Sequence, residues 1–223
     1  MLFSSVYGSL RHALHPAVFV LAGLFALTAV SLPARAAPLR VVALGDSLTA
    51  GLGLPVAQAF PTRLQAALKA RGLDVAIDNA GVSGDTAAGG LARLDWSVPD
   101  GTQLVILELG ANDMLRGLPP AIAERNLDAM LARLKARGIP VLLAGMRAAP
   151  NLGSDYVSAF EGMYPRLAAK YGVPLYPFFL DGVAADPRYQ LEDGMHPNAQ
   201  GVDRMVERAL PAVEAMLKEA KPS

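Results

Sequence analysis

Beyond residue 37 the sequence alternates short, strongly apolar runs with longer segments in which apolar residues recur at helical spacing. The runs are rich in Val, Ile and Leu and lack polar alternation, which is typical of parallel strands covered on both faces. They span residues 39–44, 74–78, 103–109, 140–146 and 173–178. We therefore predict five mostly buried strands.

The segments between and after these runs predict helices. They cover about 57–71, 85–95, 120–137, 155–171 and 198–219. The last segment carries an apolar stripe at the helical period. Its members are Val202, Met205, Val206, Leu210, Val213 and Leu217. We expect them to pack in the core rather than against a ligand.

Repeated alternation of strand and helix predicts a single α/β domain over residues 37–223. Right-handed crossovers favour a three-layer α/β/α architecture around a five-stranded, mostly parallel, flavodoxin-like sheet of order 2-1-3-4-5. Such sheets bind ligands beyond the carboxyl ends of their strands. Residues with useful chemistry should then follow the apolar runs.

Polar segments do follow four of the five runs. They are "GDS" with Ser47, "NAGVSGDT" at 79–86, "GANDMLRG" at 110–117 and "EDGMHP" at 192–197. A single polar loop of this kind is common in turns. Several of them at one edge of a sheet indicate a functional site.

Residues 1–36 are typical of an export signal. Arg11 lies in a short segment without acids, residues 16–32 are uncharged, and "ARA" at 34–36 places small residues at the −3 and −1 positions. We expect cleavage after Ala36 and a periplasmic or secreted protein without a stable membrane anchor. The alternative is an uncleaved transmembrane anchor, because 17 uncharged residues reach the lower end of the spanning range.

Composition excludes several classes of site and partner. The chain has no cysteine, which excludes disulfides, thiolate metal sites and lipid attachment to an N-terminal cysteine. Without the two arginines of residues 1–36, 18 basic residues face 20 acidic ones. No basic block or polybasic helix indicates nucleic acid or an anionic membrane surface. No run indicates a partner protein, and we expect a monomer.

The histidines narrow the chemistry. His12 and His15 belong to the predicted signal, so His196 is the one histidine of the mature sequence. A lone histidine is too few for a metal site without cysteine, and we expect neither metal nor organic cofactor. A serine nucleophile needs a neighbouring base, which only His196 supplies as an imidazole. Asp193 is placed to hold its Nδ1–H, with Glu192 as the competing carboxylate.

Acyl transfer also needs hydrogen-bond donors that stabilise the developing oxyanion. We expect these to be the backbone N–H groups of Ser47 and Gly81 and the side-chain amide of Asn112. We interpret Asn79 and Asp113 as turn and strand-end residues that tie loops together.

These blocks resemble the SGNH, or GDSL, hydrolase superfamily, in the order "GDSLTAG", "NAGVSGDT", "GANDMLRG" and "DGMHP". Together they cover nearly all of residues 39–197, and the similarity is greatest to the arylesterase and multifunctional thioesterase I/lysophospholipase branch. The resemblance implies a nucleophile, base and carboxylate at Ser47, His196 and Asp193, and the oxyanion donors named above. It also implies a mobile, substrate-facing loop over 113–120, where Met114, Leu115 and Leu118 are candidates for an acyl pocket.

The expected function is hydrolysis of small acyl esters, aryl or alkyl, and of thioesters or lysophospholipids, through an acyl-serine. Three alternatives stay open. An acyltransferase would use the same residues, an esterase of O-acetylated carbohydrates would differ in its pocket, and a binding module could keep the fold without the chemistry.

Overall fold

The apolar runs form a parallel sheet. The computed structural model describes residues 37–220, so the predicted signal peptide, residues 1–36, lies outside the described residues. Within that range the strands are β1 (Leu39–Gly45), β2 (Val75–Gly81), β3 (Leu104–Glu108), β4 (Val141–Ala144) and β5 (Leu175–Tyr176). Their order is β2-β1-β3-β4-β5 and every neighbouring pair is parallel. The predicted 2-1-3-4-5 topology is confirmed.

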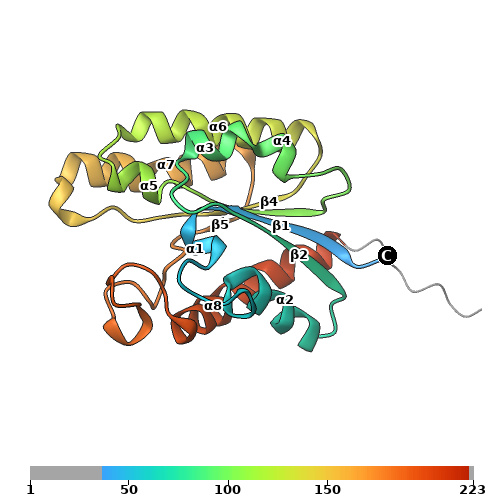
Figure 1. The fold of residues 1–223 in the computed structure, drawn as a ribbon. Coiled ribbons are helices and arrows are strands. Elements are labelled where there is room, and N and C mark those ends of the chain that lie inside the picture. The colour runs from blue at the N-terminus through green and yellow to red at the C-terminus, as the bar shows by residue number, and fades with distance from the viewer. Residues whose placement is uncertain (1–36, 221–223) are drawn as a thin grey trace, which may run out of the picture. The chain divides into compact units, whose positions relative to one another are not determined.

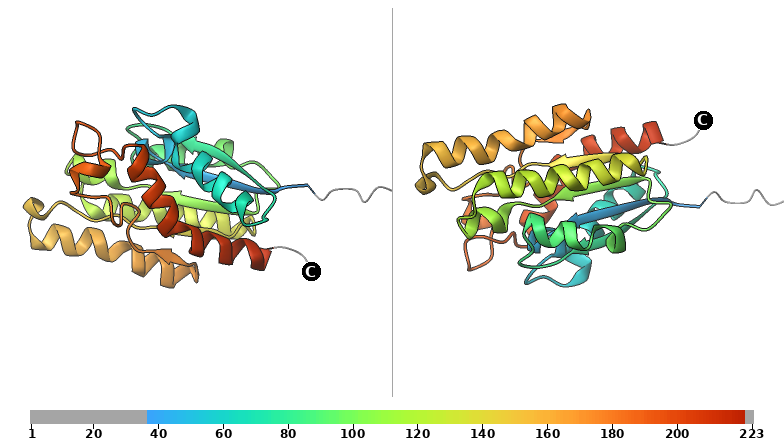
Figure 2. Two further views of the ribbon diagram at one scale, coloured as in Figure 1. Left: turned by 90° about the horizontal axis from the view of Figure 1, so that it is seen from below. Right: turned by 90° about the horizontal axis from the view of Figure 1, so that it is seen from above.

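Helices cover both faces of this sheet, as predicted (Figure 1). On one face lie α2 (Phe60–Ala70) and α8 (Ala199–Ala220). On the other lie α3 (Ala87–Ala92), α4 (Leu94–Ser97), α6 (Pro120–Ala136) and α7 (Ser154–Tyr171). Figure 2 shows α2 beside α8 from below and α6 beside α7 from above, and both pairs are in contact.

Short helical segments, which the apolar pattern did not predict, lie mostly in the loops. Two of them, α1 (Ser47–Ala50) and α5 (Ala111–Leu115), follow the carboxyl ends of β1 and β3 almost directly. Three 3-10 turns are η1 (Val56–Gln58), η2 (Pro150–Leu152) and η3 (Pro187–Tyr189). The loop that the resemblance describes as mobile therefore begins inside α5.

The core lies between the sheet and its two helical layers. All residues of β3 and β4 are buried, and in β1 only Arg40 is exposed. The apolar stripe of α8 is buried along its whole length, as its spacing predicts. Because a fully buried Val or Leu side chain stabilises a fold by about 1.5–3 kcal/mol, this stripe fixes α8 to the sheet and sets where the loop before it lies.

The strand bounds differ from the prediction at the second and fifth strands. The second run was expected to end at residue 78, whereas β2 continues to Gly81, which pairs with Gly45 of β1. Backbone pairing with β1 extends the strand through Asn79, Ala80 and Gly81, which carry no strong apolar signal. At the other edge, β5 contains only two residues, because it pairs with β4 over that length alone.

No helix among residues 37–220 is both long enough and apolar enough to cross a membrane.

Candidate active site

Ser47 lies in a tight turn at the carboxyl end of β1. It is the first residue of α1, and the Asp46 side chain caps that helix by accepting a hydrogen bond from the Leu48 N–H at 3.0 Å. Gly45 makes the turn possible, because a Cβ there would lie 2.1 Å from Thr49 Oγ1 and 2.5 Å from Glu108 Oε2. The turn leaves Ser47 only 8% exposed, with its side chain at a cavity.

Ser47, His196 and Asp193 form one chain of hydrogen bonds. The Ser47 Oγ lies 2.9 Å from His196 Nε2, and His196 Nδ1 lies 2.6 Å from Asp193 Oδ2. An ionised carboxylate only accepts hydrogen bonds, so the imidazole proton belongs on Nδ1. Nε2 is then free to accept the serine proton, the arrangement a serine nucleophile requires.

Asp193 is held by the backbone of its own turn. Its Oδ1 accepts hydrogen bonds from the N–H groups of Met195 and His196, both at 2.9 Å. These two bonds, followed by the bond to the imidazole, lower the pKa of Asp193 to about 2. Of the two carboxylates that the sequence offered, Asp193 is therefore the one that contacts His196.

Asn112 lies in α5 on the other side of Ser47. Its Nδ2 donates to Asp46 Oδ2 at 2.9 Å, which fixes the amide plane, and the residue also lines the cavity beside Ser47. Burial of Asp46 raises its pKa to about 6, although the bonds from Leu48 and Asn112 act in the opposite direction. An acceptor that is ionised at neutral pH holds the Asn112 amide more strongly than a neutral one.

A second buried carboxyl group, Glu108, lies beneath the serine turn. Its Oε2 accepts hydrogen bonds from Thr49 Oγ1 at 2.8 Å and from the Asp46 N–H at 3.3 Å. Complete burial and the negative charge of Asp46 raise the pKa of Glu108 well above its ordinary value. Through these two hydrogen bonds Glu108 supports the turn from below.

A cavity of about 720 Å³ opens beside Ser47 and His196. Most of its wall is apolar, contributed by Leu48, Leu52, Ala111, Met114, Leu115, Met146, Ala148, Ala149, Phe178, Leu180, Ala184, Ala185 and Met195. Its volume falls within the range of about 300–1,000 Å³ typical of small-molecule sites. Ser47 and His196 therefore face a space suited to an apolar organic group.

The expected role of Gly81 conflicts with the structure. Gly81 ends β2, and its N–H donates to Asn79 Oδ1 at 3.0 Å, so this donor is already used. It is not part of the cavity wall, whereas Gly84, in the same polar block, is. Gly84 has a φ of +85°, and its N–H donates to no other residue within 37–220. Gly81 therefore belongs to β2, whereas Gly84 lies in the loop beyond the end of the strand.

Of the three apolar candidates for substrate contact, two line the cavity and one does not. Met114 and Leu115 line the cavity, and Leu115 is half exposed. Leu118 does not line it, because the chain turns away after α5. Its N–H donates to the Asp113 carbonyl, and its own carbonyl accepts the Tyr156 hydroxyl at 2.8 Å.

Asn79 and Asp113 tie loops together, as their interpretation predicted. Asn79 Nδ2 donates to the Ala50 carbonyl at 3.2 Å and so joins β2 to α1. Asp113 is buried and its Oδ2 accepts the Ala87 N–H at 2.8 Å, at the start of α3. Burial raises the pKa of Asp113.

Sequence reasoning missed much of the cavity wall. Residues 146–149 follow β4, and residues 178–185 lie in the loop after β5. The rule that ligands bind beyond the carboxyl ends of strands points to both segments. Their residues are mostly apolar, so their sequence carries little signal of a reactive site.

The part of the chain that the structure describes contains no cluster of three or more His, Cys, Asp or Glu side chains suited to a metal ion.

The chain is similar to known proteins in sequence and in structure. The sequence profile described as "GDSL-like Lipase/Acylhydrolase family" matches residues 43–204. Esterase TesA of Pseudomonas aeruginosa is 40% identical over 199 residues, which cover 89% of this chain and 98% of that protein. An arylesterase of Vibrio mimicus is 42% identical over 72% of this chain and 81% of its own length.

Two further proteins extend the comparison. Thioesterase 1/protease 1/lysophospholipase L1 of Escherichia coli K12 is 39% identical over 70% of this chain and 74% of its own length. Among solved structures, the SGNH-hydrolase family esterase AlinE4 superimposes with a TM-score of 0.69 at 46% identity, over 84% of this chain and 99% of that one.

Proposed function

Because the chain belongs to the GDSL-like lipase/acylhydrolase family, we propose that it is an exported serine esterase that works through an acyl-serine intermediate. The observation that carries the proposal is the chain of hydrogen bonds from Ser47 Oγ through His196 to Asp193, beside a largely apolar cavity.

In the first step, Ser47 Oγ attacks the ester carbonyl while His196 Nε2 takes its proton. Asp193 stabilises the imidazolium through the bond at Nδ1. The tetrahedral intermediate collapses when His196 gives the proton to the leaving alcohol or thiol. The acyl group then remains on Ser47 Oγ as an ester. Water then attacks the acyl-serine by the same route, with His196 as the base.

We assign the oxyanion hole to the N–H groups of Ser47 and Gly84 and the side-chain amide of Asn112. Gly84 replaces Gly81 because its N–H is unused and the residue lines the cavity. Asn112 keeps one amide hydrogen for the oxyanion while the other is bonded to Asp46. Donors fixed before the reaction cost little reorganisation when charge develops on the substrate oxygen.

The cavity favours esters of apolar acyl or aryl groups. We place the acyl chain against Met114, Leu115 and Leu180, and we expect thioesters and lysophospholipids to fit in the same way. The names of the relatives, which include arylesterase and thioesterase 1/lysophospholipase L1, support this range.

The signal-like pattern of residues 1–36 supports export, and we propose that the mature enzyme begins at Ala37. N-terminal sequencing of protein recovered from the periplasm or the medium tests this. A mature protein that begins at Met1 and stays in the membrane fraction would favour the uncleaved anchor instead.

The main test uses residues 37–223 with and without Ser47→Ala, a fluorophosphonate probe, and p-nitrophenyl esters from acetyl to palmitoyl. We expect labelling and turnover in the wild type, and loss of both in the variant by a factor of about 10⁶ for turnover, as for other serine nucleophiles. The preferred chain length measures the usable depth of the cavity.

Three results would contradict the proposal. Binding of an apolar ester without labelling or turnover would favour a binding module. Cleavage of acetylated oligosaccharides without cleavage of p-nitrophenyl esters would favour a carbohydrate esterase. Acyl transfer to an added alcohol in preference to water would favour an acyltransferase.

A further inference from the structure

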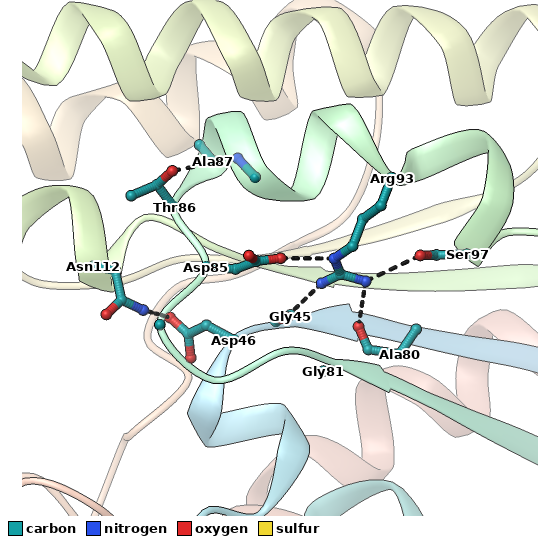
Figure 3. A network of polar contacts seen from close by, with 12 residues as sticks. Gly45, Asp46, Ala80, Gly81, Asp85, Thr86, Ala87, Arg93, Ser97 and Asn112 are labelled. Carbon is teal, nitrogen blue, oxygen red and sulfur yellow. Dashed lines mark hydrogen bonds and ion pairs between the residues drawn. The ribbon is translucent and has the colours of Figure 1, made fainter.

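Arg93 is a largely buried guanidinium that the proposed reaction does not use. It follows α3, and its side chain is 16% exposed. Its Nη2 donates to the Gly45 carbonyl at 2.8 Å, and its Nη1 donates to the Ala80 carbonyl at 2.8 Å and to Ser97 Oγ at 3.0 Å. Its Nε donates to Asp85 Oδ2 at 2.6 Å. Figure 3 shows these contacts converging on one side chain.

The segments that Arg93 joins all lead into the proposed oxyanion hole. Gly45 lies two residues before Ser47, and Asp85 directly follows Gly84. Ala80 lies near the end of β2, where the chain enters the loop that carries Gly84. One planar group therefore links the serine turn, the last pairs of β1 with β2, and the Gly84 loop.

Only an arginine fits these contacts. Three nitrogens of one rigid plane donate in three directions at once, to two carbonyls, a hydroxyl and a carboxylate. A lysine has a single nitrogen and cannot hold both strand ends while it also pairs with the carboxylate. Asp85, whose side chain is 19% exposed, neutralises the charge of Arg93.

We infer that Arg93 is a positioning residue for ester hydrolysis, which holds the Gly84 loop at a fixed separation from the Ser47 turn. Arg93 does not line the cavity, so its effect passes through the backbone it holds. The inference rests on the proposed function, because it concerns the donors assigned there to the oxyanion.

The expected effect is on the rate of the chemical step. Oxyanion donors act at about 2.7–3.1 Å from the oxyanion, and a displacement of about 1 Å can lower the rate about 100-fold. Ground-state binding depends mainly on the apolar wall of the cavity, which Arg93 does not touch. Loss of Arg93 should therefore lower kcat much more than it raises KM.

The experiment compares Arg93→Ala, Arg93→Lys and Arg137→Ala on p-nitrophenyl butyrate, at a temperature where circular dichroism shows each protein folded. Arg137 is a matched control, because its side chain is 24% exposed and donates to the Val98 carbonyl at 2.6 Å and to Asp100. It ends α6 just before β4, at the amino edge of the sheet, opposite the site.

We expect kcat of Arg93→Ala to fall about 100-fold with KM nearly unchanged, and Arg93→Lys to recover only part of the loss. Added methylguanidinium should raise kcat of Arg93→Ala and leave Arg137→Ala unchanged. Arg137→Ala should lose thermal stability but keep its kcat.

A folded Arg93→Ala with the kcat of Arg137→Ala, or without rescue by methylguanidinium, overturns the inference. If Arg93→Ala does not fold, wild-type kcat in Arg93→Lys overturns it equally, because that variant keeps the charge but not the planar fork. A wild type that hydrolyses no ester is a failure of the proposed function instead. The wild-type measurement thus separates the two failures.

Discussion

The two halves of the site are built in different ways. The serine half brings Ser47, Gly84 and Asn112 to one cavity from three segments of the chain. Buried Asp46 bonds to Asn112, and buried Glu108 supports the serine turn. The histidine half is a single loop, from Gln190 to Pro197, that closes on itself. There the Leu191 N–H donates to the His196 carbonyl at 2.7 Å, and Gln190 pairs with Pro197.

The two halves also differ in how far their side chains are exposed to solvent. The Asp193 side chain is 45% exposed, and Met195 is also exposed, whereas Asp46 and Glu108 are buried. Substitutions in the histidine loop should therefore change catalysis with little change in stability. In the serine half the same polar groups stabilise the fold and position the donors, so substitutions should change both.

The largest of these effects is expected from Asp193→Asn. The substitution keeps an oxygen for the two backbone N–H groups but places an NH₂ opposite His196 Nδ1, which favours the wrong tautomer. We expect kcat to fall by about 10⁴, while the melting temperature changes little because the side chain is nearly half exposed. Steady-state kinetics and thermal unfolding measure the two.

Glu192→Gln is the matched control for this prediction. Glu192 is exposed, and the contact to His196 belongs to Asp193. The Glu192→Gln variant should therefore keep the kcat of the wild type. If Glu192→Gln were the inactive variant, the assignment of the carboxylate would be wrong.

Asn112→Ala should affect both activity and stability. Removal of one oxyanion donor lowers kcat by about 10²–10³. It also removes the hydrogen bond to the buried Asp46 Oδ2, and an unsatisfied buried acceptor costs about 1–3 kcal/mol. Chemical denaturation and kinetics on the same preparation measure both effects.

Asn126→Ala serves as the control for this variant. Its amide donates only within α6, to the Ile122 carbonyl at 2.9 Å. It should leave kcat unchanged. If Asn112→Ala kept wild-type kcat while it lost stability, its part in the oxyanion hole would be refuted.

The smallest effect on activity is expected from Glu108→Gln. The amide oxygen still accepts from Thr49 and the Asp46 N–H, so kcat at pH 7 should change little. Stability should differ with pH. The pKa of Glu108 is raised in the folded state, so wild-type stability falls as pH rises above the ordinary pKa of 4.5. Glutamine carries no proton to lose, so the melting temperature of the variant relative to the wild type should increase from pH 5 to pH 8.

Glu219→Gln, on the exposed end of α8, provides the reference. Its melting temperature relative to the wild type should be the same at both pH values. A difference for Glu108→Gln that is also independent of pH would mean that Glu108 is not held neutral by the fold.

Where the determining contacts are local, the sequence predicted the site well. Asp193 and His196 are three residues apart in one turn, and that spacing made Asp193 the preferred candidate over Glu192, which the contact at 2.6 Å bears out. The apolar periods likewise predicted the alternation of strands and helices and the buried stripe of α8. Both depend on which faces avoid water, and that information lies in the order of apolar and polar residues.

Tertiary pairing decided what the sequence pattern left ambiguous. The block at 79–86 offers two glycines, and the choice between Gly81 and Gly84 depends on how far β2 pairs with β1. Arg93 and Glu108 show the same limit, since one follows α3 and the other is the last residue of β3. Arg93 donates to the Gly45 carbonyl and Glu108 accepts from the Thr49 hydroxyl, and both partners are more than 30 residues away in the chain.

The sequence by itself thus determined the fold class, the edge of the sheet where the site lies, and the local acid–base turn. Only the tertiary structure decided which residues of the polar blocks line the cavity and which buried polar groups hold the serine turn in place. The physical reason is that apolar burial is encoded residue by residue. The direction of a hydrogen bond, by contrast, depends on where two distant segments meet.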